Sequence, residues 1–509
     1  AVDALGASVT GTGPVIVNPS ARTRGGLVEL RLPGAGLPEG CQLVSERPAE
    51  RVLMDDTAIA VATVMVSELE FVRSILSFTV EAPDGTELLH VEREEAGTLV
   101  TPPVRRALSA LRHERSGETV RVRITNKPAV TVLARVDEVA GYGWQSWTGA
   151  SAPVHPVSAS ERGLSNGMID VVIDEAGGTF AIDGHAGLGA LVDGGDVGDT
   201  YNWCPPDVDS LVDQPTSVSV RVLEGVPLRA RVEILRSFDL PTHAEGPARV
   251  GAVAVTVSTV LELRAGEDIV RLHLELDNHG VRDHRLRVHL PLPRPAASSQ
   301  AECAFAIVER GLVAEGGPTE MGLATYPSRR FVSAGGLTVV HEGLLEYELV
   351  DLTADGATAS TLAVTLLRCT GMLSQGPMAT RPLPAGPFTP MEGPQQQGRV
   401  SASLAVHVGE RDPYELVDLA QLPLLVTRGA NGAQAATGQA LSISGAEVSA
   451  VVREAGAVHV RVMNPTSAPA VVAVEGRHGW LLDLRGRPLR AFEGTFELQP
   501  WEIATAALA

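Results

Sequence analysis

Lysine is almost missing from this chain: Lys127 is the only one, and arginine supplies nearly all of the 41 basic residues. Acidic residues number 61, so the formal net charge is −20. A nucleic-acid surface needs clustered lysine and arginine, and the charge balance therefore argues against DNA or RNA as a partner.

Cysteine is scarce as well. The four cysteines lie far apart and form no CxxC or Cys/His spacing, which indicates neither a zinc knuckle nor a disulfide framework. A reduced, cytoplasmic setting is the simplest interpretation. The residues are Cys41, Cys204, Cys303 and Cys369.

Long apolar runs are missing too. No stretch approaches the ~20 apolar residues that a membrane-spanning helix needs. The opening AVDALGASV lacks the basic flank and apolar run of a signal peptide. We therefore expect no membrane partner. The chain starts without methionine, so we expect that it has been trimmed or is one piece of a longer protein.

Motifs of common enzyme classes are also missing: no GxSxG, HExxH, P-loop or Rossmann glycine pattern stands in a supporting context. His279, His284 and His289 lie close together, but the spacing of the last two puts them on opposite faces of a strand. Solvated or capped histidines are a better interpretation than a metal site. Glu302 and Glu309 are too far apart along a strand for a glycosidase pair, so we interpret them as surface charges.

Residues 1–150 mix helix and strand signals. TPPVRRALSALRHERSG, residues 101–117, predicts a helix that Thr101 can cap, with prolines in the first turn and apolar residues at helical spacing. Residues 55–76 carry acids at the start and Arg73 near the end, an order that suits a helix dipole. Their β-branched residues leave a strand as the alternative.

Strands dominate the rest of the chain. Segments such as VAVTVSTVLELRAG and IVRLHLELDN alternate apolar and polar residues, which puts one face of each strand in a core. So many long strands in succession predict a large antiparallel β-sandwich over 151–430. After the linker TRGANGAQAATGQA, the same alternation predicts a small β domain over 431–509. The predicted fold class is mainly β.

The segment GDVGDTYNWCPP, Gly195 to Pro206, is chemically unlike the strands around it. Its two prolines exclude a helix and predict a turn followed by an extended piece. Carboxylates and amides hydrogen-bond sugar hydroxyls, and aromatic rings cover the apolar face of a pyranose. A sugar site is one interpretation, and a turn whose aromatics plug the end of the sandwich is the other. The residues concerned are Asp196, Asp199, Tyr201, Asn202, Trp203 and Asp207.

A second unusual segment, MATRPLPAGPFTPMEGPQQQG, spans residues 378–398. Its prolines exclude a central strand and predict a long ordered loop. Arg381 could bind an anionic or hydroxylated ligand, and Gln395 to Gln397 could follow it. A rigid connector with Arg381 stacked on a neighbour is the alternative.

Four segments together resemble a known family: GDTYNWCPPDVDSLV, LRAGEDIVRLHLELDNHGVRDHRLRVHLPLP, YPSRRFVSAGGLTVVHEGLLEYELV and FELQPWEIATAAL. In this order they resemble the C-terminal, β-rich half of bacterial α-mannosidases of glycoside hydrolase family 38, over essentially the whole chain. The resemblance implies a mutarotase-like antiparallel β-super-sandwich. A small mixed α/β region would precede it and a small β-sandwich domain would follow it.

The resemblance also implies chemistry. Members of the family are retaining, zinc-dependent exo-α-mannosidases whose N-terminal domain supplies the nucleophile, the acid/base carboxylate and the zinc ligands. Nothing in this chain corresponds to that domain, so the resemblance implies that the catalytic residues and the zinc lie outside the chain. The β half contributes a tyrosine and an arginine to the sugar site, which match Tyr201 and Arg381. Asp199, Asn202 and Trp203 are the accompanying substrate-binding candidates.

Three hypotheses follow. The chain is the β portion of an α-mannosidase and completes the mannose site of an N-terminal catalytic domain or chain. Alternatively, it is a non-catalytic, carbohydrate-binding mutarotase-like module for mannose-containing glycans. The third hypothesis is a scaffold whose sandwich makes the contacts of a homo-oligomer.

Overall fold

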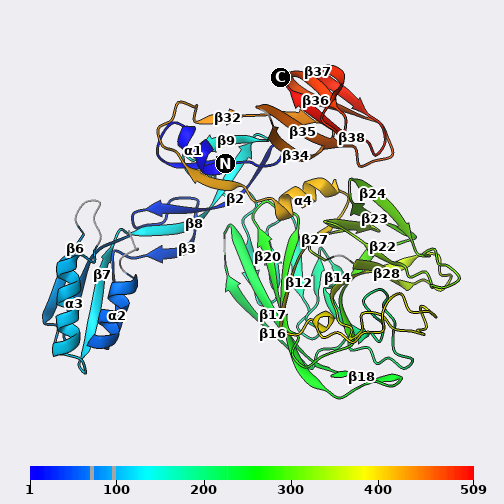
Figure 1. Ribbon diagram of the computed structural model, residues 1–509, viewed down its shortest axis with the longest axis horizontal. Helices are drawn as coiled ribbons and strands as arrows, with labels where there is room; N and C mark the ends of the chain where they lie inside the picture. The colour runs from blue at the N-terminus through cyan, green and yellow to red at the C-terminus, as the bar shows by residue number, and fades with distance from the viewer. Residues whose placement is uncertain (69–73, 94–98, 226, 345, 455) are drawn as a thin grey trace. The chain divides into compact units, whose positions relative to one another are not determined.

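The computed structural model describes the chain except for residues 69–73, 94–98, 226, 345 and 455 (Figure 1). Strands make up 53% of it and helices 8%, which confirms the mainly β class. The chain divides into two compact units, one of residues 27–135 and 148–151 and one of the remaining residues. The helices are α1 (Val2–Ser8), α2 (Ala58–Glu68), α3 (Pro102–Glu114) and α4 (Pro413–Gln421), with a short 3-10 turn η1 (Gly393–Gln395).

The smaller unit is a mixed α/β module. Helices α2 and α3 pack with a four-stranded sheet, and residues such as Met65, Phe78 and Leu108 share one buried core. Strand β7 alternates exposed and buried residues, as its sequence period predicts. The sheet order is β4 (Glu50–Thr57), β7 (Thr119–Asn126), β5 (Ile75–Glu81) and β6 (Glu87–Glu92). A three-stranded sheet has the order β2 (Arg24–Pro33), β8 (Ala129–Val139) and β3 (Gln42–Arg47).

Both predicted helices of this region exist, with different boundaries. The helix expected within 55–76 starts only at Ala58, because β4 runs to Thr57. Arg73, expected near its end, lies outside the described residues. Thr101 occupies the N-cap position of α3, but its side chain makes no capping hydrogen bond in the structure, which corrects its predicted role.

The larger unit is built around a nine-stranded antiparallel sheet and a five-stranded one (Figure 1). The nine strands, in sheet order, are β16 (Ser217–Glu224), β17 (Arg229–Leu240), β20 (Val253–Arg264), β21 (Val270–Asp277), β30 (Arg399–Val408), β27 (Leu337–Glu342), β26 (Phe331–Ala334), β23 (Ser298–Cys303) and β24 (Ala306–Gly311). The five are β15 (Ala190–Gly195), β22 (His284–Ala296), β29 (Ala359–Arg368), β28 (Glu346–Leu352) and β25 (Thr325–Pro327).

Smaller sheets complete this unit. One consists of β10 (Ser158–Ser160), β11 (Gly163–Ser165), β12 (Asp170–Ile173), β13 (Phe180–Ile182) and β14 (His185–Leu188), and a hairpin joins β18 (His243–Glu245) and β19 (Ala248–Val250). Another has the order β31 (Leu425–Arg428), β1 (Pro14–Val17), β9 (Gly143–Ser146) and β32 (Thr437–Gln439). The C-terminal sheet contains β33 (Ile443–Ser444), β36 (Ala470–Leu482), β38 (Ile503–Leu508), β35 (Ala457–Met463), β34 (Glu447–Glu454) and β37 (Pro488–Leu498), which pairs with β36.

The core of the larger unit contains polar connections as well as apolar packing. Arg236 on β17 is buried, and its Nη1 donates to the carbonyl oxygen of Gly189 at 2.7 Å. Its Nη2 donates to Oγ1 of Thr259 on the neighbouring strand β20 at 2.9 Å. This side chain therefore ties the nine-stranded sheet to the bend between β14 and β15.

Two of the side chains interpreted from the sequence, Glu302 and His284, are buried. Glu302 on β23 has no exposed surface and pairs with Arg330, so its interpretation as a surface charge was wrong. His284 is also fully buried, with Nδ1 2.6 Å from Oδ2 of Asp193 and Nε2 3.1 Å from Oδ1 of Asn278. It is a capped histidine, but not a solvated one.

The reactive side chains are unevenly distributed. Lys127 is exposed in the turn between β7 and β8. Three of the four cysteines are buried and Cys303 is partly exposed, all of them as free thiols. Within the part of the chain that the structure describes, no helix is both long and apolar enough to cross a membrane.

Candidate functional site

Sheet topology brings the two unusual segments together. Strands β15 and β29 both pair antiparallel with β22 and flank it, so they run in the same direction. Gly195, the last residue of β15, pairs with His284 at the start of β22, and Arg368, the last residue of β29, pairs with Arg285. The segment after β15 and the loop after β29 therefore leave the same end of the sheet.

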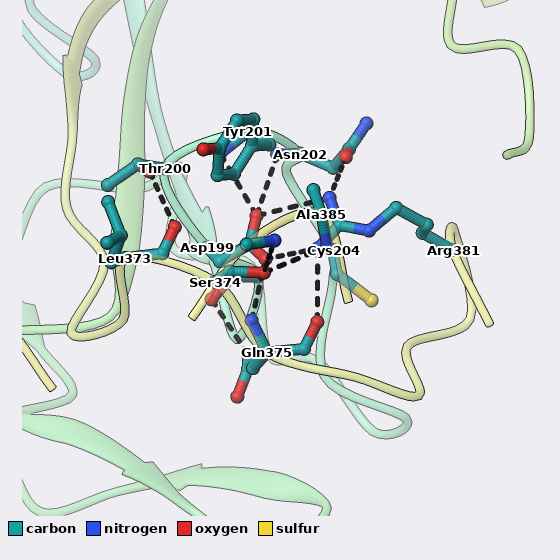
Figure 2. A network of polar contacts seen from close by, with 12 residues as sticks. Asp199, Thr200, Tyr201, Asn202, Cys204, Leu373, Ser374, Gln375, Arg381 and Ala385 are labelled. Atoms are coloured by element: carbon teal, nitrogen blue, oxygen red, sulfur yellow. Dashed lines mark hydrogen bonds and ion pairs between the residues drawn. The ribbon is translucent and has the colours of Figure 1, made fainter. Parts of the chain in front are cut away.

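Asp199 organises the turn at this end (Figure 2). Its Oδ1 accepts the backbone N–H groups of Tyr201 and Asn202, each at 3.0 Å, as in an Asx turn. Its Oδ2 accepts the backbone N–H of Gln375 at 2.8 Å. A side chain at Gly198 would clash with the carbonyl oxygen of Asn202, so only glycine fits there. The carboxylate thus fixes the turn and ties it to the loop after β29.

Arg381 comes from that loop and pairs with the turn. Its Nη2 forms an ion pair with Oδ2 of Asp199, and its Nη1 donates to Oδ1 of Asn202. Its Nε donates to the carbonyl oxygen of Leu383 at 2.8 Å. Only 4% of Arg381 is exposed, so its guanidinium holds protein groups instead of pointing to solvent.

The ion pair sets the charge state of Asp199. Burial by itself would raise the pKa of this carboxyl group. The hydrogen bonds from Arg381 and from the backbone of Gln375, Asn202 and Tyr201 outweigh burial and hold the pKa below its ordinary value. Asp199 is therefore an anion that stabilises the turn.

The aromatic residues of the turn remain accessible. Tyr201 is 56% exposed, and a side chain at Gly386 would come within 3.3 Å of its hydroxyl oxygen. Trp203 is partly exposed; its Nε1 donates to the carbonyl oxygen of Gly195 at 3.1 Å, and Arg285 lies over its ring with Cζ 4.0 Å from the centroid. Neighbouring groups thus hold both rings in place, and part of each ring stays accessible to solvent.

A cavity of about 430 Å³ opens beside these rings. Its volume suits a small polar ligand, since ligand pockets commonly measure about 300–1,000 Å³. Asn202 contributes its amide and donates Nδ2–H to Oε1 of Glu320 at 2.7 Å. Lining side chains include Tyr201, Asn202, Trp203, Glu320, Glu346 and Arg368.

Asp196 lies at the end of β15 without exposed surface. Burial raises the pKa of its carboxyl group to about 6, although Arg368 opposes the shift with Nε 2.7 Å from Oδ2. It also accepts the backbone N–H of Gly198 at 2.9 Å. Asp196 thus supports the cavity wall through Arg368 and has no direct access to the space.

The predicted site residues therefore separate into two groups. Tyr201, Asn202 and Trp203 line the cavity. Asp199 and Arg381 do not line it, and their ion pair stabilises the turn that carries the other three residues. This places Arg381 as in the stacked-connector alternative, with Cζ 5.8 Å from the centroid of the Tyr201 ring. Whether any of the five binds a substrate stays a prediction.

The remaining candidates lie elsewhere. Asp207 is exposed and does not line this cavity. The glutamines expected to follow Arg381 toward a ligand instead anchor the loop: Gln395 donates Nε2–H to Oδ1 of Asp283 at 2.7 Å, and Gln397 donates to the carbonyl oxygen of Val281 at 2.6 Å. That expectation is corrected, because these amides are used within the protein.

The sequence analysis missed the charged side chains of the cavity, which are Glu315, Glu320, Glu346 and Arg368. Arg368 ends a strand whose neighbours in the sheet were not predictable from its own sequence. Glu320 lies in the glycine-flanked stretch EGGPTEMG, residues 315–322, which was a usable signal for a polar loop.

The described residues offer no evident metal-binding site. They contain no group of three or more His, Cys, Asp or Glu side chains arranged to hold a metal ion. Zinc therefore does not fit the site that this chain presents, and we assign it no step here.

Comparisons with known proteins give the family context. No profile of a protein family matches the chain. A curated protein of Halalkalibacterium halodurans named "Putative mannosylglycerate hydrolase" is 28% identical over 238 residues, which cover 41% of this chain and 25% of the relative.

Two solved structures from Enterococcus faecalis share the fold, each with a TM-score of 0.65 and 20% identity. One is an α-mannosidase, matched over 98% of this chain and 56% of that chain. The other is a protein in glycosyl hydrolase family 38, matched over 99% and 60%. The chain thus spans little more than half of these structures, and the resemblance to family 38 is confirmed as a likeness of fold.

Proposed function

We propose that this chain is the β-rich portion of a retaining, zinc-dependent exo-α-mannosidase. It would complete the mannose-binding site of an N-terminal catalytic domain or chain that supplies the nucleophile and the zinc. One observation carries the proposal: a polar cavity with two accessible aromatic rings lies where the two unusual segments meet, in a fold shared with a solved α-mannosidase. Its substrate would be an α-mannoside or a mannose-containing glycan.

The side chains have separate tasks in this proposal. The phenol of Tyr201 donates a hydrogen bond to a sugar oxygen, and the amide of Asn202 bonds hydroxyl groups. The face of Trp203 covers the apolar side of the ring. Asp199 and Arg381 position all three through the turn that they hold together. A positioned donor of this kind acts most strongly where charge develops during reaction.

The rim of the cavity suits a protein partner. Two large apolar side chains that line the cavity, Tyr201 and Met321, are more than half exposed, and so are Leu383 and Phe388 on the loop that carries Arg381. Exposed apolar clusters with polar surroundings mark interaction surfaces. We therefore place the catalytic domain or chain on this rim.

We also propose a domain organisation and a cellular location for this chain. The large sheets form a mutarotase-like β-super-sandwich over 151–430, between mixed modules over 1–150 and a small β domain over 431–509. We propose a cytoplasmic setting, without nucleic-acid or membrane partners. A homo-oligomer remains compatible with these assignments.

The experiment is a titration of the purified chain with methyl α-mannoside, followed by ligand-observed NMR. Tyr201→Ala should weaken binding about tenfold or more, because the accessible ring and its hydroxyl are lost. Trp480→Ala is the matched control, because Trp480 is 50% exposed but lies on β36 in the C-terminal sheet. Absence of binding, or equal effects of the two substitutions, would contradict the proposal.

A non-catalytic carbohydrate-binding module is the second candidate. The observation in its favour is that the cavity is lined within this one unit while the described residues offer no metal site. A polypeptide extended by the complete upstream reading frame separates the two: mannoside binding without hydrolysis by that longer protein would favour the module.

A further inference from the structure

The cavity beside Tyr201 carries an excess of negative charge. Three carboxylates line it, those of Glu315, Glu320 and Glu346, against one guanidinium, that of Arg368. Such an excess creates a local potential that a bound ligand experiences directly, because the walls exclude part of the solvent.

The positive charge of Arg368 is committed to the protein. Its Nε lies 2.7 Å from Oδ2 of Asp196, and its Nη2 donates to the carbonyl oxygen of Asp199, also at 2.7 Å. Asp196 is a buried acid in contact with this guanidinium, so its negative charge offsets part of the positive charge of Arg368. Arg368 is therefore poorly suited to hold a carboxylate of a ligand.

The carboxylates that line the cavity differ in how closely positive charges pair with them. Glu320 is exposed and accepts a hydrogen bond from the neutral amide of Asn202, which brings no positive charge to it. Glu346 accepts the hydroxyl of Thr365 at 2.8 Å and lies 3.6 Å from Nη1 of Arg285. Glu348 beside it is contacted by Arg285 at 3.4 Å and by Arg287 at 3.0 Å, so two arginines offset Glu346 and Glu348.

We propose that this cavity selects against mannosides whose aglycone carries a negative charge and accepts neutral or amine-bearing ones. Glu315 and Glu320 are the specificity-determining residues, because both are exposed at the cavity without a cationic partner among the described contacts. The inference rests on the proposed function, since it presumes that a mannoside occupies the cavity.

The selection should be measurable with three probes and the full chain. They are methyl α-mannoside, 2-aminoethyl α-mannoside and α-mannosylglycerate, which are neutral, cationic and anionic near pH 7. For like charges separated by several ångströms in partly solvated surroundings, we expect the anionic probe to bind about three- to thirtyfold more weakly than the neutral one. Raising the salt concentration to about 0.5 M should narrow this difference by screening.

Charge-neutralising variants assign the effect to residues. The double variant Glu315→Gln and Glu320→Gln should bring the anionic probe toward the affinity of the neutral one and weaken the cationic probe. Glutamine keeps an acceptor for Asn202, and both positions are exposed, so the fold should persist. Glu342→Gln, an exposed acid at the end of β27 that does not line the cavity, is the matched control.

The outcomes separate the two proposals. Equal affinity of the unaltered chain for all three probes would overturn the charge selection and leave the proposed sugar site standing. A difference that persists in the double variant would overturn the role of Glu315 and Glu320. Failure of every probe to bind would defeat the proposed function, and the selection with it.

Discussion

Arg381 lies beneath Tyr201, with its Cζ 5.8 Å from the centroid of the phenol ring, while the same guanidinium pairs with Asp199 in the preceding turn. The exposed ring thus rests on a buried ion pair. The orientation of Tyr201 depends on a loop that is distant in sequence, and this dependence can be tested apart from ligand binding.

Arg381→Ala should lower the free energy of unfolding by about 3–5 kcal/mol, because it leaves the buried carboxylate of Asp199 without its cation. Arg381→Lys should recover part of the loss, since lysine keeps the charge but not the two-pronged geometry. Urea unfolding measures both. Arg294→Ala is the control: Arg294 pairs with Glu410 on the exposed surface, and stability should hardly change. Equal losses for Arg381 and Arg294 would mean that the ion pair contributes little.

Tyr201→Phe, made in the complete hydrolase, should lower kcat about ten- to a thousandfold if the hydroxyl stabilises charge in the transition state. The ring and its position over Arg381 are retained, so the effect isolates the hydroxyl. Steady-state kinetics with an aryl α-mannoside provide the measurement. A raised KM with unchanged kcat would show that Tyr201 only binds substrate.

Asp196 should make stability fall as pH rises. Burial raises the pKa of its carboxyl group to about 6, so the folded protein binds a proton more tightly than the unfolded chain between about pH 4 and pH 6. Its contribution is complete below pH 4 and is lost as the pH passes 6. The contribution amounts to at most about 3 kcal/mol, because the pKa of Asp196 is about 2 higher in the folded protein than in the unfolded chain.

Asp196→Asn should remove this slope, and thermal unfolding from pH 4 to 7 compares the variant with the parent. His289 acts with the opposite sign: burial lowers its pKa to about 4, so its contribution is present above pH 6.5 and declines as the pH falls. Because this histidine is common to both proteins, the difference between the profiles reports Asp196. Parallel profiles would contradict the assignment.

The purified chain should contain no stoichiometric zinc and should not hydrolyse nitrophenyl α-mannoside, whereas adding the catalytic domain or chain should supply both. The reason is that the described residues provide no group of His, Cys, Asp or Glu side chains arranged to hold a metal ion, and the proposed function places the nucleophile outside this chain. Elemental analysis and a colorimetric assay on mass-verified protein measure these properties. Zinc-dependent turnover by the chain alone would show that the active site has been misplaced.

Local features of the fold could be predicted from the sequence, whereas contacts between distant segments could not. Alternation along β7 and the Asp199 turn depend on neighbouring residues, so pattern and turn chemistry predict them. The meeting of that turn with Arg381 depends on β15 and β29 flanking β22, which no local pattern encodes. Burial of Glu302 escaped prediction for the same reason, because its partner Arg330 arrives from another part of the chain.

The scarcity of reactive side chains gives this protein two nearly unique chemical handles. Lys127 provides the sole side-chain amine and is exposed in the smaller compact unit, whereas Cys303 is the cysteine outside the buried set and belongs to the larger one. The α-amine of Ala1 belongs to the larger unit and reacts first near neutral pH because its pKa is lower than that of lysine, so it can be blocked beforehand. An amine-reactive donor dye and a thiol-reactive acceptor would then label one unit each without any engineered residue. Energy transfer between them would follow the separation of the two units during mannoside titration in native, unmutated protein.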